Sequence, residues 1–210
     1  MKILILGATG VVGKATLHWA LEEIRVAQVI APTRRSLPAH PKLLNPVAPS
    51  LDLLLADATG WAVDAVICAM GTTIRNAGSK EAFRHVDYEL PIAFSERANR
   101  SGASALALVS SPGASLTIPL FYCRTKGEVE RDIKQIGFQS VTIVRPGMIG
   151  GDREEFRFAE RIVLPIAKLL HPLLPKGLRV NPAANIAAML GDAVLRHRPG
   201  VRMVTSRDLV

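Results

Sequence analysis

A glycine-rich segment near the N-terminus constrains the fold more than any other feature of this 210-residue chain. The segment follows residues 3–6, an apolar run that predicts a buried parallel strand, and precedes residues 14–24, whose apolar spacing suits a helix packed on a sheet. A glycine turn between a strand and a helix N-terminus cradles a dinucleotide, because its backbone admits the pyrophosphate and the helix dipole attracts the charge. The residues that we expect to bind such a cofactor here are Gly7, Thr9, Gly10, Val11, Val12 and Gly13.

Length and composition indicate one compact domain, because 210 residues with 49% hydrophobic content can bury a full core. The first residues lack the pattern of a secretory signal, and the apolar residues 162–174 are too short to span a bilayer. Cys68 and Cys123 fit a reducing compartment and have no metal-type spacing. We therefore expect a cytoplasmic protein with no bound metal and no membrane partner.

The net charge of +8 raises the possibility of a nucleic-acid partner. The basic residues are spread along the chain, however, without an aromatic-interleaved patch or a nucleic-acid-binding motif. A basic surface also favours a polyphosphate cofactor. We expect a small-molecule substrate and no nucleic acid, and the sequence leaves the oligomeric state open, a homodimer included.

Beyond the first unit, strand-like and helix-like segments keep alternating. The predicted strands cover residues 26–31, 65–70, 105–109 and 141–144, and the predicted helices cover residues 51–55, 80–100 and 121–136. Five prolines make residues 32–49 a long loop with at most a short strand near Val47, and Pro91 suggests a kink or restart within its helix. The alternation is typical of an α/β fold with a doubly wound parallel sheet, whose site lies along the carboxyl ends of the strands.

The end of the second strand bears on the choice of cofactor. NAD-specific proteins hold the ribose hydroxyls with an acidic side chain about 20 residues past the glycines. This chain has Thr33-Arg34-Arg35 there and no acidic residue. Two guanidinium groups can bind the 2′-phosphate of NADP, although they can also be solvated loop residues. We expect NADP(H) to be preferred over NAD(H), with Arg34 and Arg35 as its ligands.

The catalytic candidates lie after the predicted strand of residues 105–109. Tyr122 and Lys126 stand four residues apart, so they share one face of the predicted helix. A nearby ammonium favours the phenolate, and the phenol can then exchange a proton with a substrate hydroxyl or carbonyl. Ser110 and Ser111 end the strand, where a hydroxyl can polarise that carbonyl. Either serine fits, and we favour Ser111.

Taken together, these motifs resemble those of the short-chain dehydrogenases/reductases, in the atypical branch with a Gly-x-x-Gly-x-x-Gly loop. The chain is most similar to the Tat-interacting oxidoreductase-like family and to small bacterial proteins labelled nucleoside-diphosphate-sugar epimerases. The matching segments span nearly the whole chain: Gly7-Ala8-Thr9-Gly10, Thr33-Arg34-Arg35, Cys68-Ala69-Met70-Gly71-Thr72-Thr73, Phe83-Arg84-His85-Val86-Asp87, Val109-Ser110-Ser111, residues 122–128 and Arg145-Pro146-Gly147.

The resemblance implies an NAD(P)-binding Rossmann fold forming a single domain over residues 1–210, with residues 147–210 contributing a small substrate-side cap. It further implies that Lys126 holds the nicotinamide ribose, that Asp87 braces backbone near the strands of residues 65–70 and 105–109, and that other residues line the cofactor: Ala69, Gly71, Thr72, Tyr122, Pro146 and Gly147. Asn185-Ile186-Ala187 stands where extended relatives start a helix. The apolar spacing within residues 156–174 favours core packing.

Three functions are compatible with these residues. The favoured one is an NADP(H)-dependent oxidoreductase for a small carbonyl or alcohol substrate, with Tyr122 as acid and base. A second is a protein that senses NADP(H) or acts as a scaffold without turnover, since a fold does not settle activity. A third, a sugar-nucleotide epimerase, is disfavoured because such enzymes have a larger C-terminal region than this chain.

Overall fold

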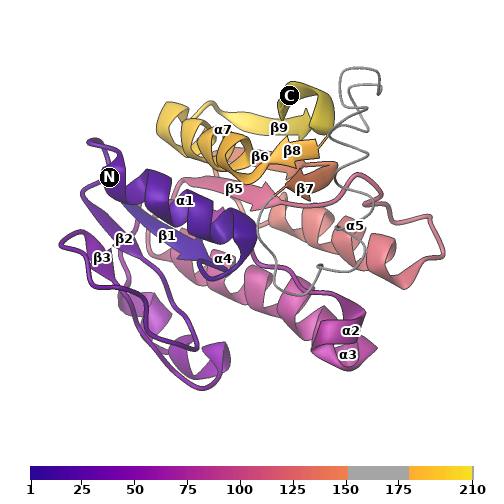
Figure 1. The fold of residues 1–210 in the computed structure, drawn as a ribbon, viewed down its shortest axis with the longest axis horizontal. Coiled ribbons are helices and arrows are strands. Elements are labelled where there is room, and N and C mark those ends of the chain that lie inside the picture. The colour runs from indigo at the N-terminus through magenta and orange to yellow at the C-terminus, as the bar shows by residue number, and fades with distance from the viewer. Residues whose placement is uncertain (151–179, 210) are drawn as a thin grey trace.

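The structure, a computed structural model, describes residues 1–150 and 180–209 and is built on one parallel sheet (Figure 1). The strand order is β3-β2-β1-β4-β5-β6-β9, and every pair of neighbours is parallel. The strands are β1 (Lys2–Leu6), β2 (Gln28–Ile30), β3 (Leu43–Leu44), β4 (Ala65–Cys68), β5 (Ala105–Val109), β6 (Ser140–Arg145) and β9 (Gly200–Thr205). The predicted doubly wound α/β sheet is thus confirmed.

Helices cover both faces of this sheet (Figure 1). One face carries α1 (Val11–Glu22) and α7 (Ala183–Arg196), and the other carries α4 (Leu90–Arg100) and α5 (Phe121–Ile133). The shorter elements are α2 (Ile74–Ala77), α3 (Lys80–Arg84), and a small parallel sheet of β7 (Met148–Gly150) with β8 (Val180–Pro182). Single turns of 3-10 helix cover Leu51–Leu54, Asp57–Gly60 and Ser206–Leu209.

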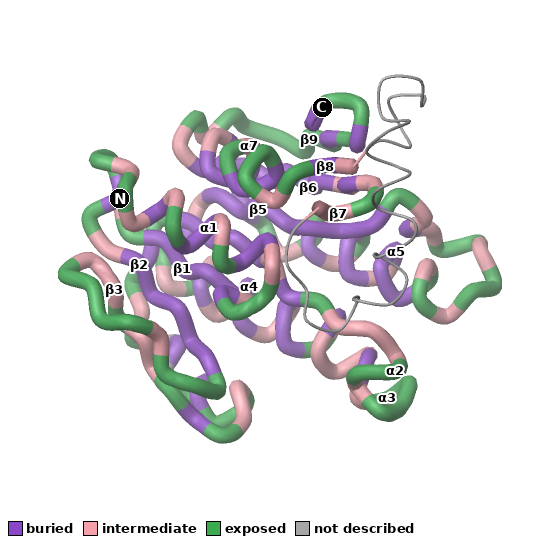
Figure 2. The backbone as a smooth tube through the Cα atoms, in the orientation of Figure 1, coloured by how far each residue is buried: buried purple, intermediate pink, exposed green. Residues whose placement is uncertain are grey.

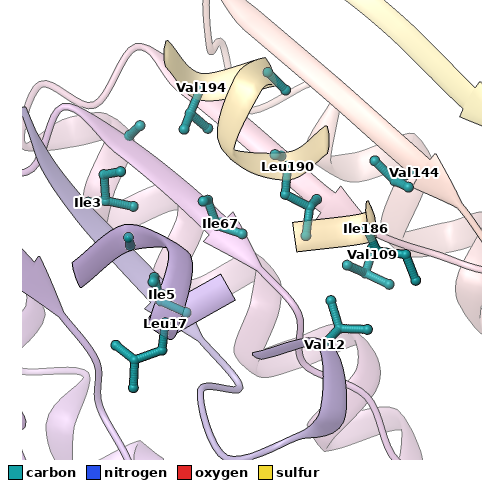
Figure 3. Packing of buried hydrophobic residues seen from close by; sticks show 14 of the residues in the cluster. Ile3, Ile5, Val12, Leu17, Ile67, Val109, Val144, Ile186, Leu190 and Val194 are labelled. Carbon is teal, nitrogen blue, oxygen red and sulfur yellow. The ribbon is translucent and has the colours of Figure 1, made fainter. Parts of the chain in front are cut away.

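The core is two-sided because side chains alternate along each buried strand. In β1, Ile3 and Ile5 join the cluster under α1 and α7, whereas Leu4 and Leu6 join the cluster under α4 and α5. Figure 3 shows the first cluster, and Figure 2 shows how completely the central strands are buried. Continuous apolar strands of this kind require helices on both faces.

The long predicted helix over residues 80–100 is divided in three. α3 is followed by one wider, π-helical turn over His85–Glu89, and α4 then begins at Leu90. Pro91 lies in the first turn of α4, directly after the π-helical turn, and its ring leaves no N–H to continue the backbone hydrogen bonding of that turn. The kink or restart expected at Pro91 takes the form of a π-helical turn within a continuous helical run, which the sequence did not indicate.

The C-terminal region completes the sheet. Within residues 147–210, α7 packs on the sheet and β9 extends it beside β6, so these two elements belong to the Rossmann layers. The sequence indicated only the start of α7, near Asn185, and did not predict β9. The apolar stretch over residues 156–174 lies outside the described residues.

Close contact between α1 and α7 yields a prediction about stability. A Cβ atom on Gly191 would lie 2.2–2.4 Å from the indole ring of Trp19. Gly191→Ala should therefore lower the free energy of unfolding by about 1–3 kcal/mol, the usual cost of overpacking. Urea unfolding measures the change, and Gly60→Ala is the control because an added methyl there meets no atom within 4 Å. Equal stability of the two variants would contradict the packing described.

Candidate active site

The turn between β1 and α1 contains three glycines with different surroundings. Gly7 has a φ of 82°, and a Cβ there would lie 2.7 Å from the Ala69 carbonyl. A Cβ on Gly13 would lie 1.9 Å from the Gly7 carbonyl oxygen. A Cβ on Gly10, by contrast, would have only that same oxygen near it in the described part of the chain, at 3.4 Å. The missing side chains of Gly7 and Gly13 thus allow neighbouring backbone segments to pack closely, whereas Gly10 leaves open space beside the N-terminus of α1.

That open space belongs to a cleft of about 470 Å³ along the carboxyl ends of β1, β2 and β4. The loops after these strands all contribute to it, and α3 together with the π-helical turn contributes the opposite wall. Seven of the residues predicted to bind cofactor line the cleft: Gly7, Thr9, Gly10, Arg34, Ala69, Gly71 and Thr72. The other candidates, Val11, Val12, Gly13, Arg35, Tyr122, Lys126, Pro146 and Gly147, do not line it.

The loop that carries Arg34 is held by Asn45, a residue without any sequence signal. The Asn45 amide donates to the Ala31 carbonyl at 2.6 Å and to Thr33 Oγ1 at 2.8 Å. The Thr33 hydroxyl in turn donates to the Arg35 carbonyl at 2.7 Å. Arg34 and Arg35 are exposed, and within residues 1–150 and 180–209 neither pairs with a carboxylate. Both guanidinium groups are therefore free to meet an anion.

Opposite the glycine turn, His85 lines the cleft and bridges two acids. Its Nδ1 lies 2.8 Å from Glu89 Oε2 and its Nε2 lies 3.1 Å from Asp52 Oδ2. The hydrogen bond to Glu89, followed by that to Asp52, raises the pKa of His85 above its ordinary value. This bridge ties the π-helical turn to the 3-10 turn Leu51–Leu54, in which the Asp52 N–H donates to the Ser50 hydroxyl oxygen.

Lys126 is buried and forms an ion pair with Asp87, 2.7 Å from Nζ to Oδ1. Burial alone would lower the pKa of Lys126, but the Asp87 carboxylate outweighs it and the pKa is raised. The second oxygen, Asp87 Oδ2, accepts the Thr72 backbone N–H at 2.8 Å. Asp87 therefore does brace backbone after β4. A Cβ on Gly71 would lie 3.6 Å from Lys126 Nζ, so the bare glycine leaves the ammonium beside the cleft wall.

The two candidate serines have different partners. The Ser110 hydroxyl donates to Glu130 at 2.5 Å, and Glu130 also accepts two hydrogen bonds from Arg145 at 2.8 and 2.6 Å. Within the described ranges, Ser111 Oγ accepts only a long hydrogen bond, 3.4 Å, from the Gly113 N–H. Ser110 is thus committed to a buried polar network, and Ser111 retains its hydroxyl for another partner. No sequence pattern indicated the pairing of Glu130 with Arg145.

Tyr122 lies in the first turn of α5, 37% exposed, with its ring packed on Phe83 at a centroid distance of 5.6 Å. In the described part of the chain no hydrogen bond joins its hydroxyl to Ser110, Ser111 or Lys126. Apo active sites often show such loose geometry. The structure therefore brings these residues to one end of the sheet without a preformed tyrosine–serine contact.

Backbone after β6 is fixed by Asn181, another residue that sequence reasoning missed. Its side-chain oxygen accepts the Gly147 N–H at 2.7 Å, and its amide donates to the Ser206 carbonyl at 3.1 Å. Asn181 is fully buried, so Pro146 and Gly147 are held to the C-terminal region.

Within residues 1–150 and 180–209, no cluster of metal-ligating side chains is present. No helix in those same ranges has the length and hydropathy needed to cross a membrane.

Comparison with solved structures identifies the fold as that of the short-chain dehydrogenases. A short-chain dehydrogenase family protein from Francisella tularensis superposes with a TM-score of 0.76 at 16% identity, covering 99% of this chain and 98% of that one. The Bordetella bronchiseptica enzyme WbmG, solved in complex with NAD, superposes with a TM-score of 0.70 at 16% identity, covering 98% of this chain and 72% of that one. No family model matches the sequence.

Comparison with curated proteins places the chain more narrowly: it belongs to the family of the protein FMP52. The FMP52 protein of Candida albicans is 34% identical over 164 residues, covering 74% of this chain and 70% of the relative. The FMP52 protein of Aspergillus clavatus is 36% identical over 175 residues, covering 79% of this chain and 74% of the relative. The narrower resemblance to the Tat-interacting family is not confirmed by these names.

The relatives correct one expectation from the sequence. Each is named a mitochondrial protein, so the predicted cytoplasmic localisation is wrong. The prediction rested on the absence of a secretory pattern and on the small number of cysteines. Neither feature distinguishes the cytoplasm from another reducing compartment, which is the physical reason for the error.

Proposed function

We propose that this protein is an NADP(H)-dependent oxidoreductase of the short-chain dehydrogenase type, acting on a small carbonyl or alcohol substrate. One observation carries the proposal: a single cleft joins the open face of Gly10 to Gly71, whose missing side chain leaves the Lys126 ammonium beside it. A pyrophosphate fits the first end, where the N-terminus of α1 has no side-chain cap. A ribose hydroxyl fits the second, within reach of an ammonium.

The proposed preference for NADP(H) rests on Arg34. It lines the same cleft as Gly10, is exposed, and has no carboxylate partner within the described ranges. Arg35 is one residue further along a loop that Asn45 and Thr33 hold in place. A guanidinium binds a phosphate through paired charge-assisted hydrogen bonds, whereas it gains less from a bare ribose hydroxyl.

The proposed chemistry assigns one task to each polar side chain. A bound NADPH supplies hydride to the substrate carbon. Tyr122 gives its hydroxyl proton to the substrate oxygen, and in the reverse direction it takes that proton back. Ser111, which has no charged partner among the described residues, donates a hydrogen bond to the same oxygen. Lys126 holds the ribose and favours the phenolate that Tyr122 becomes.

This chain spans nearly all of the Francisella protein, 72% of WbmG and 77% of the UDP-glucose 4-epimerase of Thermotoga maritima. These shares assign no substrate to this chain. The turnover experiment below decides between an oxidoreductase and a cofactor sensor.

Gly10→Val should abolish NADPH binding and leave the protein folded. Among the described residues, a Cβ on Gly10 would have only the Gly7 carbonyl oxygen within 4 Å, so the bulk of valine would extend into the space proposed for the pyrophosphate. NADPH fluorescence titration measures binding, and thermal unfolding checks the fold. Gly10→Ala is the graded control and should weaken binding less. Normal NADPH affinity in the valine variant would show that the glycine turn is not the cofactor cradle.

Replacing Arg34 and Arg35 together with alanine should reduce the preference for NADPH over NADH by about 1–3 kcal/mol, the scale of hydrogen bonds to charged groups. Calorimetric titration of both cofactors gives the difference directly. Arg207→Ala removes one exposed positive charge from the C-terminal 3-10 turn and should leave the preference unchanged. Equal affinity of the unmodified protein for NADPH and NADH would refute the assignment.

Tyr122→Phe should reduce kcat by roughly 10²–10⁴-fold, the range for a positioned acid or base, with little change in NADPH affinity. NADPH oxidation with a panel of aldehydes, ketones and quinones measures turnover. The control is Tyr88→Phe, because the Tyr88 hydroxyl donates to Asp132 instead. Full activity of the Tyr122 variant would rule out its role. Tight NADPH binding without turnover across the panel would favour a cofactor sensor.

A further inference from the structure

Asp87 occupies an unusual place in the fold. It lies in the middle of the single π-helical turn His85–Glu89, between α3 and α4, and it is 1% exposed. Such turns interrupt a regular helix at a cost and recur at functional sites. Three residues of this one turn face the site: His85 and Val86 line the cleft, and Asp87 forms an ion pair with Lys126.

The Asp87 carboxylate joins three separate parts of the chain. One oxygen pairs with Lys126 Nζ on α5 at 2.7 Å, and the other accepts the Thr72 N–H from the loop after β4 at 2.8 Å. Gly71, next to Thr72, would place a Cβ 3.5 Å from Asp87 and 3.6 Å from Lys126. The ion pair therefore lies close beside the Gly71–Thr72 loop. Gly71, which has no side chain, stands between the ion pair and the cleft.

A buried ammonium without a counter-ion is costly, and burial favours its neutral form. The titratable groups that act on Lys126 are Asp87, Tyr122 and Cys68. Burial raises the pKa of the Cys68 thiol to about 11, so it is uncharged at neutral pH. Asp87 is thus the carboxylate that keeps Lys126 charged in this apolar setting.

We propose that Asp87 is a positioning residue, whose carboxylate fixes the charged Lys126 amine to the Gly71–Thr72 loop before the cofactor binds. The inference rests on the proposed function for the identity of the cofactor. It adds a role that lies outside the tyrosine, lysine and serine set. Asp87 acts through Lys126 and through the loop, and it does not touch the reacting atoms.

Asp87→Asn isolates the charge from the hydrogen bond. The amide oxygen of asparagine can still accept the Thr72 N–H, whereas the negative partner of Lys126 is removed. Without that partner, burial lowers the pKa of Lys126, so the amine loses its proton as the pH rises through a lower value. The charged form is then present at low pH and absent at high pH.

The test follows Lys126 and cofactor binding in the full chain between pH 7 and pH 9. Lysine labelled with ¹³C at Cε reports the protonation of Lys126 by NMR, with Lys126→Met identifying its resonance. NADPH fluorescence titration gives the affinity. In Asp87→Asn we expect Lys126 to titrate at lower pH and NADPH to bind about tenfold more weakly at pH 9 than at pH 7. The unmodified protein and Tyr88→Phe, altered in the same turn, should show no such pH dependence.

Unchanged titration of Lys126 in Asp87→Asn would overturn the inference, whatever the cofactor affinity. If the unmodified protein binds no nicotinamide dinucleotide, the proposed function fails, and the NMR titration alone decides whether Asp87 holds the lysine. Should Asp87→Asn fail to fold, the double variant with Lys126→Met removes both buried charges. NADPH affinity equal to that of Lys126→Met alone would support action through the lysine, and a further loss would overturn it.

Discussion

The backbone of the turn between β1 and α1 runs closer to its neighbours than any side chain would permit. Gly7 lies against the carbonyl of Ala69 after β4, and Gly13 lies against the carbonyl of Gly7. These two approaches set where α1 begins and how near the loops after β1 and β4 come to each other. The cleft, and the position of Gly10 within it, follow from that close approach.

Two ion pairs with a buried carboxylate stand near the carboxyl ends of the described sheet strands: the buried Lys126 with Asp87, and the partly exposed Arg145 with Glu130. Pairs of this kind contribute little to stability, because the cost of removing both charges from water offsets their attraction. Apolar residues of the same size would fill the space as well. Their presence on the side where ligands bind in such sheets is therefore better explained by the site than by the fold.

Much of the fold was predictable because its signals are local. The strand of residues 3–6, the glycine turn and the restart at Pro91 each depend on the character of a few consecutive residues. The pairing of Asp87 with Lys126, of Glu130 with Ser110, and of Asn45 with Thr33 was not predictable in the same way. Each joins residues distant in sequence, and no local pattern sets the geometry that brings them together. The edge strand β9 escaped notice because five of its six residues are exposed, which leaves little alternation to read.

A crystal structure of the protein with NADP⁺ bound tests the central claim most directly. We expect the pyrophosphate against the first turn of α1 beside Gly10, the 2′-phosphate at Arg34, and the nicotinamide ribose over Gly71 within hydrogen-bonding distance of Lys126. A dinucleotide bound outside this cleft, or bound with its nicotinamide end at Arg34, would contradict this assignment of the site.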